Sequence, residues 1–279
     1  MPFPALVRCG PSGWSFPDWH NVIYPRPRSK NFHPLEYLAH YFDLVEIDSS
    51  FHGPLRPEIA KLWVRMVKHN AGFVFTARLG REFTHERSLG PDGVKVFKEG
   101  LWPLLNSGRL GCLLMEFPWT FRFNSGNRDF LIQLRRTFHE FPLAAEMRHS
   151  SWMVDEALGT LVDYRIGFVN IDQPQFPRAM PPTAIITSSI GYVRLHGRTT
   201  VDWFEDDACA TLRLHNEKYL YSLTELSEWQ ERIERVAAFT KNTFVVATNH
   251  SGGKSAVNAL QLGKLLHAAS YSPVLERIA

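Results

Sequence analysis

Charged and polar side chains recur at the ends of short apolar runs in this sequence. The clearest cases are Glu46 with Asp48, Glu146 with Arg148, Arg194 with His196 and Arg198, and Asn249 with His250. Residues two apart in a strand share a face, so the members of each group are expected to point the same way. Carboxylates and imidazoles can transfer protons, and guanidiniums can bind anions. The pattern therefore predicts an acid–base site that also recognises negative charge.

The segment around Glu146 is the best single candidate for such a site. Strand parity sends Glu146 and Arg148 to one side, and His149 follows at the exit of the run. A carboxylate beside a guanidinium stays ionised, because the opposite charge lowers its pKa. Two interpretations remain open: a structural ion pair closing the top of a core, or a carboxylate that orients Arg148 toward an anionic substrate.

Two cations and an imidazole stand at alternating positions further along the chain, at Arg194, His196 and Arg198. Two guanidiniums are costly to bury without anions, which favours anion recognition. Like charge from the arginines would lower the pKa of His196 and favour a neutral ring that could act as a base. We take the catalytic candidates to be Glu46, Glu146, His196 and His250. The substrate-binding candidates are Arg78, Arg148, Arg194, Arg198, Asn249, Trp14 and Trp152.

Eight strand-like runs position these residues. They span about 6–10, 43–48, 72–77, 111–116, 143–148, 166–171, 190–196 and 243–248. Helix-period apolar residues lie between most of them, as in Leu226, Trp229 and Ile233, with Thr224 as a plausible N-cap. Alternating strands and helices indicate parallel strands joined by right-handed crossovers. Eight such units predict an α/β fold, a TIM-like (β/α)₈ barrel formed by a single domain over residues 1–279.

Two connections differ from the rest. Residues 172–186 are rich in proline and predict an irregular link with at most a short helix. Residues 197–223 form the longest segment after a strand, and they contain Trp203 and several acidic residues. A loop this long in a compact domain is more often functional than neutral, so we expect a lid or substrate wall over the C-terminal mouth.

Composition narrows the class of protein. A net charge of +3 over 279 residues does not require nucleic acid or an anionic membrane as partner. The cysteines (Cys9, Cys112 and Cys209) lack CxxC spacing, which fits a reducing compartment. No signal peptide or membrane-length apolar run is evident, so a cytoplasmic protein is expected. No nucleotide or other cofactor motif is recognisable, so we expect no cofactor.

Several segments together resemble the domain of unknown function 72 (YecE-like) family. They include Cys9 to Phe16, Val45 to Phe51, Glu146 to Trp152, Tyr192 to Arg198 and Thr248 to His250, in collinear order over nearly the whole chain. The resemblance implies a TIM-like barrel with a charged mouth and supplies no reaction. Arg78 stands where the family usually has lysine, and Glu116 lies in a run that usually contains glutamine.

The leading hypothesis is an enzyme acting on a small phosphorylated or carboxylated molecule by hydrolase- or lyase-type acid–base chemistry. The alternatives are a nucleic-acid-binding or processing protein and a metal-assisted hydrolase. Nearby arginines would repel a cation, so we expect no bound metal. If one were bound, the ligands would come from Glu46, Asp48, Glu116, Glu146, His149, Asp172, His196 and His250.

Overall fold

Eight parallel strands form one sheet in the computed structural model, which describes residues 6–25, 31–199 and 218–266. The strands are β1 (Leu6–Pro11), β2 (Leu44–Ile47), β3 (Val74–Arg78), β4 (Leu110–Glu116), β5 (Leu143–Glu146), β6 (Gly167–Asp172), β7 (Ile190–Leu195) and β8 (Asn242–Ala247). The two ends of every predicted run lie within two residues of the ends of the observed strand.

The sheet closes on itself through a short seam between β1 and β2. Hydrogen-bonded ladders follow the order β1-β8-β7-β6-β5-β4-β3-β2. At the remaining edge Ser12 and Glu46 form a parallel bridge, and Gly13 N–H donates to the Glu46 carbonyl at 2.9 Å. A Cβ at Gly10 would lie 1.9 Å from the Leu44 carbonyl oxygen, so only glycine fits here. The predicted (β/α)₈ barrel is confirmed.

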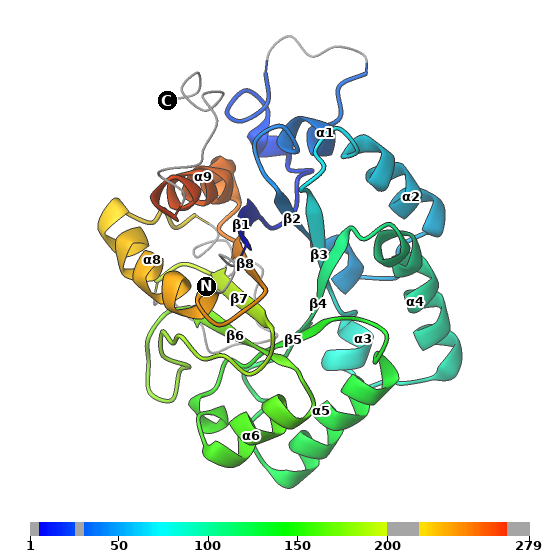
Figure 1. Ribbon diagram of the computed structural model, residues 1–279, viewed down its shortest axis with the longest axis vertical. Helices are drawn as coiled ribbons and strands as arrows, with labels where there is room; N and C mark the ends of the chain where they lie inside the picture. Colours follow the sequence, from blue (N-terminus) through cyan, green and yellow to red (C-terminus); the bar gives the residue numbers. More distant parts are fainter. Residues whose placement is uncertain (1–5, 26–30, 200–217, 267–279) are drawn as a thin grey trace.

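Helices lie outside the ring of strands (Figure 1). They are α1 (Pro34–Leu38), α2 (Pro57–Met66), α3 (Arg81–Thr84), α4 (Pro91–Asn106), α5 (Ser125–Thr137), α6 (Asp155–Asp163), α8 (Leu223–Ala237) and α9 (Lys254–Leu266). Short 3₁₀ turns follow several strands: η1 (Pro17–Trp19), η2 (Ser49–Phe51), η3 (Ser150–Trp152) and η4 (Ser251–Gly253).

The apolar face of α8 packs on the barrel as its periodicity predicts, with Trp229 and Ile233 fully buried. The predicted N-cap was wrong by two residues. Ser222 rather than Thr224 caps the helix, because Glu225 reaches back to the Ser222 backbone N–H while the Ser222 hydroxyl accepts from the Glu225 N–H. This reciprocal capping box satisfies two otherwise unpaired donors.

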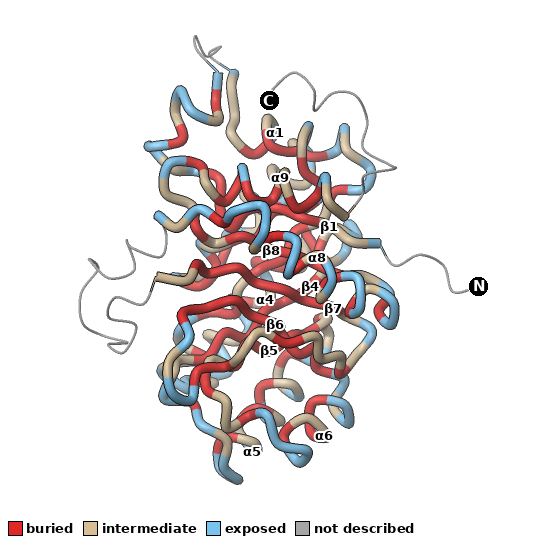
Figure 2. Tube along the Cα trace, turned by 90° about the vertical axis from the view of Figure 1, so that its left-hand side faces the viewer, coloured by how far each residue is buried: buried red, intermediate tan, exposed pale blue. Residues whose placement is uncertain are grey.

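The strands form the buried centre of the molecule and the helices carry its exposed surface (Figure 2). Aromatic side chains fill the barrel interior. Gly111 on β4 leaves room for the Phe244 ring of β8, whose Cζ would lie 2.6 Å from an added Cβ. The charged side chains described below occupy the C-terminal end of the same interior, so the apolar packing forms a floor beneath them.

The link between β6 and β7 contains no helix or strand over residues 173–189, as its proline content predicts. The expected lid falls mostly on residues 200–217, which lie outside the described part of the chain. Cys209 also lies there, whereas Cys9 and Cys112 are free and buried. Among the described residues, no helix is long and apolar enough to cross a membrane.

Candidate functional site

Arg194 is the centre of a buried ionic cluster at the C-terminal end of the barrel. Its Nη1 donates to Glu116 Oε2 at 2.8 Å and to Glu146 Oε2 at 2.6 Å. Its Nη2 donates to Glu46 Oε1 at 2.8 Å. One guanidinium from β7 therefore joins carboxylates from β2, β4 and β5 across the barrel.

Glu46 accepts hydrogen bonds from Arg194 and from two hydroxyl groups. The Ser12 hydroxyl, at the closing seam, donates to its Oε1 at 2.8 Å. The Tyr192 hydroxyl donates to its Oε2 at 2.7 Å and lies 2.9 Å from Thr76 Oγ1. Burial and the Glu46 charge raise the pKa of Tyr192 well above its usual range, so the phenol stays protonated and acts as a donor. Glu46 is thus held in one orientation and has no exposed surface.

Arg78 and Arg148 form the upper layer of the cluster. Arg78 pairs with Asp48 and, through Nη2, with Glu116 Oε2 at 2.8 Å, while its guanidinium lies 3.8 Å above the Phe51 ring. Arg148 Nη2 lies 2.7 Å from Glu116 Oε1 and 3.2 Å from Glu146 Oε1. The Arg78 and Arg148 side chains keep 12% and 15% exposure and Glu116 keeps 11%, against 3% for Arg194. These three side chains, together with that of Asp48 at 39% exposure, are the part of the cluster that a ligand can reach.

His196 supports Glu146 from the other side. Its Nε2 lies 2.9 Å from Glu146 Oε1, and its Nδ1 lies 3.1 Å from Thr248 Oγ1. Burial lowers the pKa of His196, and the charges of Arg148 and Arg194 lower it further against the opposing effect of Glu146. The predicted direction is confirmed, although burial rather than like charge is the largest cause. An ionised Glu146 can only accept, so the neutral ring carries its proton on Nε2.

Glu146 and Glu116 stay ionised despite their burial. Burial alone would raise the pKa of Glu146, but Arg194, His196 and Arg148 together hold it at about 2. Burial likewise opposes ionisation of Glu116, and Arg78, Arg194 and Arg148 keep its pKa well below the usual range. The same carboxylates raise the pKa of Arg194. Glu116, Glu146 and Arg194 are therefore fixed charges around pH 7.

The positive and negative charges of the ionic cluster nearly cancel. Four carboxylates, of Glu46, Asp48, Glu116 and Glu146, surround three guanidiniums. The arginines consequently offer oriented donors rather than a surplus of positive charge. Within the described residues, no three potential metal ligands are arranged to hold an ion. Each cluster carboxylate has an arginine where a metal would have to bind.

Six of the predicted site residues meet in this cluster: Glu46, Arg78, Glu146, Arg148, Arg194 and His196. Arg198 does not join it, contrary to strand parity. Gly197 turns the chain with a φ of 96°, and Arg198 then points outward to Asp172 (Nε to Oδ2, 2.9 Å) and to Glu228 on α8. Alternation ends where the strand ends, which is the physical reason for the failure.

Asn249 and His250 also lie apart from the cluster. The Asn249 amide donates to the Tyr219 carbonyl at 2.8 Å and to Asn258 Oδ1 at 2.9 Å, which ties the end of β8 to α9. The His250 ring stacks on Phe16 with centroids 4.3 Å apart. These contacts position the chain after β8.

Trp14 and Trp152 pack into the core. Trp14 meets Trp63 edge-on, with ring centroids 4.9 Å apart. Trp152 is fully buried, stacks on Phe121 and donates from Nε1 to its carbonyl at 2.7 Å. Neither ring presents a face for stacking a ligand, because the strand-following segments that carry them fold back onto the barrel.

Sequence reasoning did not place two contributors to the site. Glu116 accepts from all three arginines of the cluster. The sequence named it only as an alternative metal ligand and as a departure from the family's glutamine-containing run, and its position at the end of a predicted strand was the available signal. His85 follows α3, with its ring 5.2 Å from that of Phe51. Burial lowers the pKa of His85, with Glu116 opposing and Arg81, Arg78 and Arg148 reinforcing the shift. No strand precedes His85 directly, so parity could not find it.

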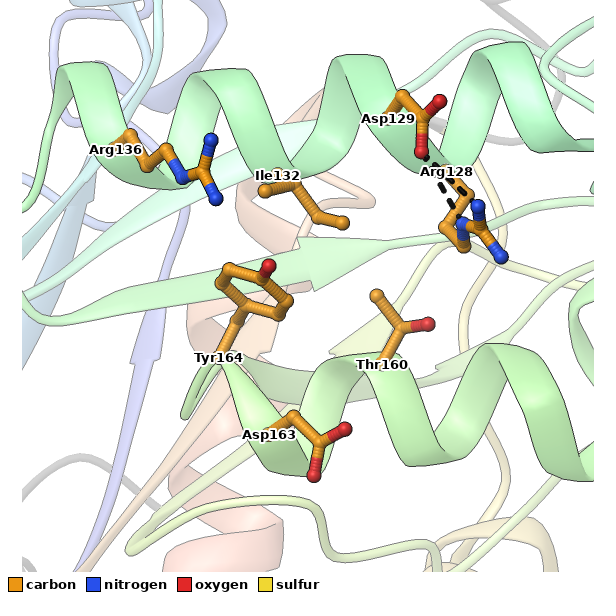
Figure 3. A pocket seen from close by; sticks show the side chains of 7 residues that line it. All are labelled: Arg128, Asp129, Ile132, Arg136, Thr160, Asp163 and Tyr164. Atoms are coloured by element: carbon orange, nitrogen blue, oxygen red, sulfur yellow. Dashed lines mark hydrogen bonds and ion pairs between the residues drawn. The ribbon is translucent and has the colours of Figure 1, made fainter.

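A separate pocket of about 450 Å³ lies on the outer surface and shares no residue with the charged cluster. It opens between α5 and α6 (Figure 3) and is lined by Arg128, Asp129, Ile132, Arg136, Thr160, Asp163 and Tyr164. Arg128 pairs there with Asp129 and with Glu156. The buried Thr160 hydroxyl that lines the pocket is already satisfied, because it donates to the Glu156 carbonyl at 2.8 Å.

The fold and site together define a (β/α)₈-barrel protein with an ionic cluster at the C-terminal ends of its strands. Residues 8–277 match the family model described as "Protein of unknown function DUF72", and the chain belongs to this family. It is 27% identical over 272 residues to UPF0759 protein YunF of Bacillus subtilis (strain 168), covering 94% of this chain and 95% of YunF. The expected family membership is confirmed.

Two solved structures of the family share the fold. A DUF72 family protein from Thermotoga maritima is 31% identical, with a TM-score of 0.78 over 94% of this chain and 99% of the other. A DUF72 family protein from Enterococcus faecalis is 25% identical, with a TM-score of 0.82 over 96% and 97% of the two chains. The barrel is thus common to these relatives.

Proposed function

We propose that this protein is an enzyme that binds a small organic anion at the C-terminal mouth of its barrel and transforms it by proton transfer, in a hydrolase- or lyase-type reaction. The buried cluster around Arg194 carries the proposal. Burying ions costs several kcal/mol for each, and apolar side chains of similar volume would often stabilise a core equally well. A concentration of groups with displaced pKa values at the end of a barrel is typical of a catalytic site.

The partly exposed layer supplies the contacts to substrate in this proposal. Arg78 and Arg148 would donate hydrogen bonds to an oxygen of the reacting group, beside Glu116. Below them Glu46, Glu146 and Arg194 are too buried to touch a ligand, and they hold the upper layer in place. We therefore assign Glu46, Glu146 and His196 as positioning residues.

His85 is the group best placed to move a proton. Its Nδ1 bonds to Thr84 Oγ1 at 2.9 Å, and within the described residues no hydrogen bond engages its Nε2. The lowered pKa keeps the ring neutral at pH 7, where it can accept a proton. His196 is less suited, since Glu146 and Thr248 occupy its two ring nitrogens.

A thermal-shift screen followed by product analysis tests the proposal. Phosphate monoesters and small carboxylates would be incubated with the wild-type protein, with Arg148→Gln, and with the matched surface control Arg128→Gln. We expect at least one anion to raise the melting temperature and to be converted, with both effects lost in Arg148→Gln and retained in Arg128→Gln. Identical behaviour of the two variants, or no response by the wild type across the panel, would refute the assignment.

The role of His85 is tested on the same converted compound. His85→Gln should lower kcat and abolish the acidic limb of the pH–rate profile, since that limb would report protonation of the base. His196→Gln should leave the limb in place while changing the KM, because it acts through Glu146 and Arg148. A His85→Gln profile identical to that of the wild type would exclude His85 as the proton acceptor.

A further inference from the structure

A second group of polar side chains surrounds His149 on the rim of the same barrel end. The turn η3, which follows β5, holds together the segments that follow β4 and β6. Phe123 N–H donates to Ser151 Oγ at 2.9 Å, and Ser150 N–H donates to the Arg178 carbonyl at 2.9 Å. His149 also forms an isolated antiparallel bridge with Ala179. The backbone therefore fixes the segments containing Arg122 and Arg178 on either side of His149.

The hydrogen bonds of His149 determine where its proton lies. Nδ1 accepts from the Ser151 backbone N–H at 3.1 Å and lies 2.9 Å from Ser151 Oγ. An Nδ1 that accepts from a backbone N–H carries no proton, so the neutral ring carries its proton on Nε2. The ring is neutral at pH 7 because burial, and then the charges of Arg122 and Arg178, lower the pKa of His149.

The Nε2 of His149 is a buried donor. His149 is only 4% exposed, and among the described residues its Nε2 has no hydrogen-bond partner. An unsatisfied buried donor costs about 1–3 kcal/mol, and a bound ion or ligand that accepts from it is one of the recognised ways to offset that cost. The Trp119 ring lies 4.7 Å from the imidazole and packs in turn against Phe176, and an apolar surrounding of this kind strengthens any hydrogen bond that the donor makes.

Positive charge on the rim is uncompensated, unlike that in the cluster. Arg122 and Arg178 are exposed, and in the described part of the chain neither pairs with a carboxylate. By contrast, Arg78, Arg148 and Arg194 each contact two or three carboxylates. An anion approaching this end of the barrel is attracted to the rim more strongly than to the self-neutralised cluster.

Arg178 is also held in an unusual backbone conformation. It has a φ of 70° at the third position of the turn Phe176–Ala179, after Pro177, where glycine is the favoured residue. Glycine at this position would relieve strain and would remove the charged side chain. The position therefore allows the charge to be deleted without a cost to the fold.

We propose that the Nε2–H of His149 and the guanidiniums of Arg122 and Arg178 form an oxyanion subsite, which binds a phosphate or carboxylate group. The subsite rests on the proposed function in one respect: it would hold the charged group of the substrate whose reacting group lies at Arg78 and Arg148. An oxyanion would accept a direct hydrogen bond from His149 and charge-assisted contacts from the two arginines.

Nitrogen NMR of histidine-labelled protein, titrated with inorganic phosphate at constant ionic strength, tests the subsite. We expect a saturable shift of the His149 Nε2 resonance, and no change at His139, which is exposed on the outer surface. A parallel titration with acetate distinguishes a carboxylate from a phosphate preference. A linear, non-saturable response to both anions, equal to that given by chloride, would overturn the proposal.

Substitutions separate binding from folding. Arg178→Gly should weaken phosphate binding about tenfold, as expected for the loss of one charge-assisted contact, with an unchanged or higher melting temperature. His149→Phe should abolish saturable binding, followed through Trp fluorescence. Unchanged affinity in Arg178→Gly and His149→Phe would refute the subsite and leave the role of Arg148 standing. Binding that depends on both residues, with no compound converted, would support the subsite and refute the enzymatic proposal.

Discussion

At the scale of single residues, Arg194 and Arg148 have the same side chain and different energetic roles. Arg194 is buried and bridges three carboxylates. Arg148 shares Glu116 and Glu146 with other arginines and reaches the surface of the cluster. Loss of Arg194 leaves the fully buried Glu46 without a cationic partner among the described residues, whereas loss of Arg148 leaves each of its partners another guanidinium.

The two arginines should therefore differ in their effect on stability. Arg194→Ala is expected to lower the free energy of unfolding by about 3–5 kcal/mol, the usual cost of breaking a buried ion pair. Arg148→Ala should lower it by only about 1 kcal/mol, as for a largely redundant pair. Urea denaturation at neutral pH measures both. Equal losses would show that Arg148 is as much a part of the structural network as Arg194.

Histidine burial predicts the pH dependence of stability. The pKa values of His85, His149 and His196 are lowered below the 6.5 of an unfolded chain. Just below pH 6.5 the unfolded state binds more protons than the folded state, so stability falls as the pH falls. The Glu146 carboxylate, with its pKa near 2, adds a further loss as the pH falls below the ordinary value of 4.5.

We expect the free energy of unfolding to be lower at about pH 5.5 than at about pH 7.5, because each of the three histidines binds a proton more readily in the unfolded chain. His196→Gln keeps a donor for Glu146 and removes one titrating group. The difference between the two pH values should therefore be smaller in this variant. A wild-type protein that is equally stable at both pH values would contradict the lowered pKa values.

Strand parity predicted the site residues only as far as the strands extend. It correctly placed Glu46, Glu146 and Arg194 inside the barrel. It failed for Arg198, because Gly197 adopts a left-handed φ and the alternation stops. The packing of Trp152 against Phe121 depends on a contact between segments some thirty residues apart, which no local pattern encodes.

At the scale of elements, the sequence predicts the individual strands more clearly than it predicts how they close into a barrel. Eight apolar runs gave the strands, since parallel strands buried on both faces are nearly continuous in apolar residues. Nothing in the sequence marked the seam between β1 and β2, where Ser12 and Gly13 bond to Glu46. Ser12 and Glu46, which are 34 residues apart in the chain, thus meet through tertiary structure alone.

The seam gives a prediction at this scale. Gly10→Ala would place a Cβ 1.9 Å from the Leu44 carbonyl, so β1 must move away from β2. We expect a loss of stability of at least about 1–3 kcal/mol, the range for overpacking. Gly159→Ala in α6 is the matched control: no atom lies within 4 Å of its added Cβ, and a slight gain is expected in a helix. Melting temperatures that fall equally in both variants would refute the close-approach argument.

At the scale of the whole molecule, the distribution of charge is more informative than its sum. The net charge of +3 conceals a nearly neutral core cluster and a rim whose arginines lack described carboxylate partners. A protein that tracks a nucleic-acid backbone needs many unpaired cations along a surface. Arginines already paired with carboxylates cannot release counterions from phosphates, which weighs against the nucleic-acid alternative.

The same distribution predicts the metal content of the protein. A divalent cation at the mouth would have to displace Arg78, Arg148 and Arg194 from Glu46, Glu116 and Glu146, and it would feel the repulsion of all three guanidiniums. We expect protein purified without chelators to carry no stoichiometric zinc, iron or manganese by elemental analysis, and its melting temperature to be unaffected by EDTA. About one metal ion per chain, lost on Glu116→Gln and retained on Glu140→Gln at the Lys98 surface pair, would instead favour metal-assisted hydrolysis.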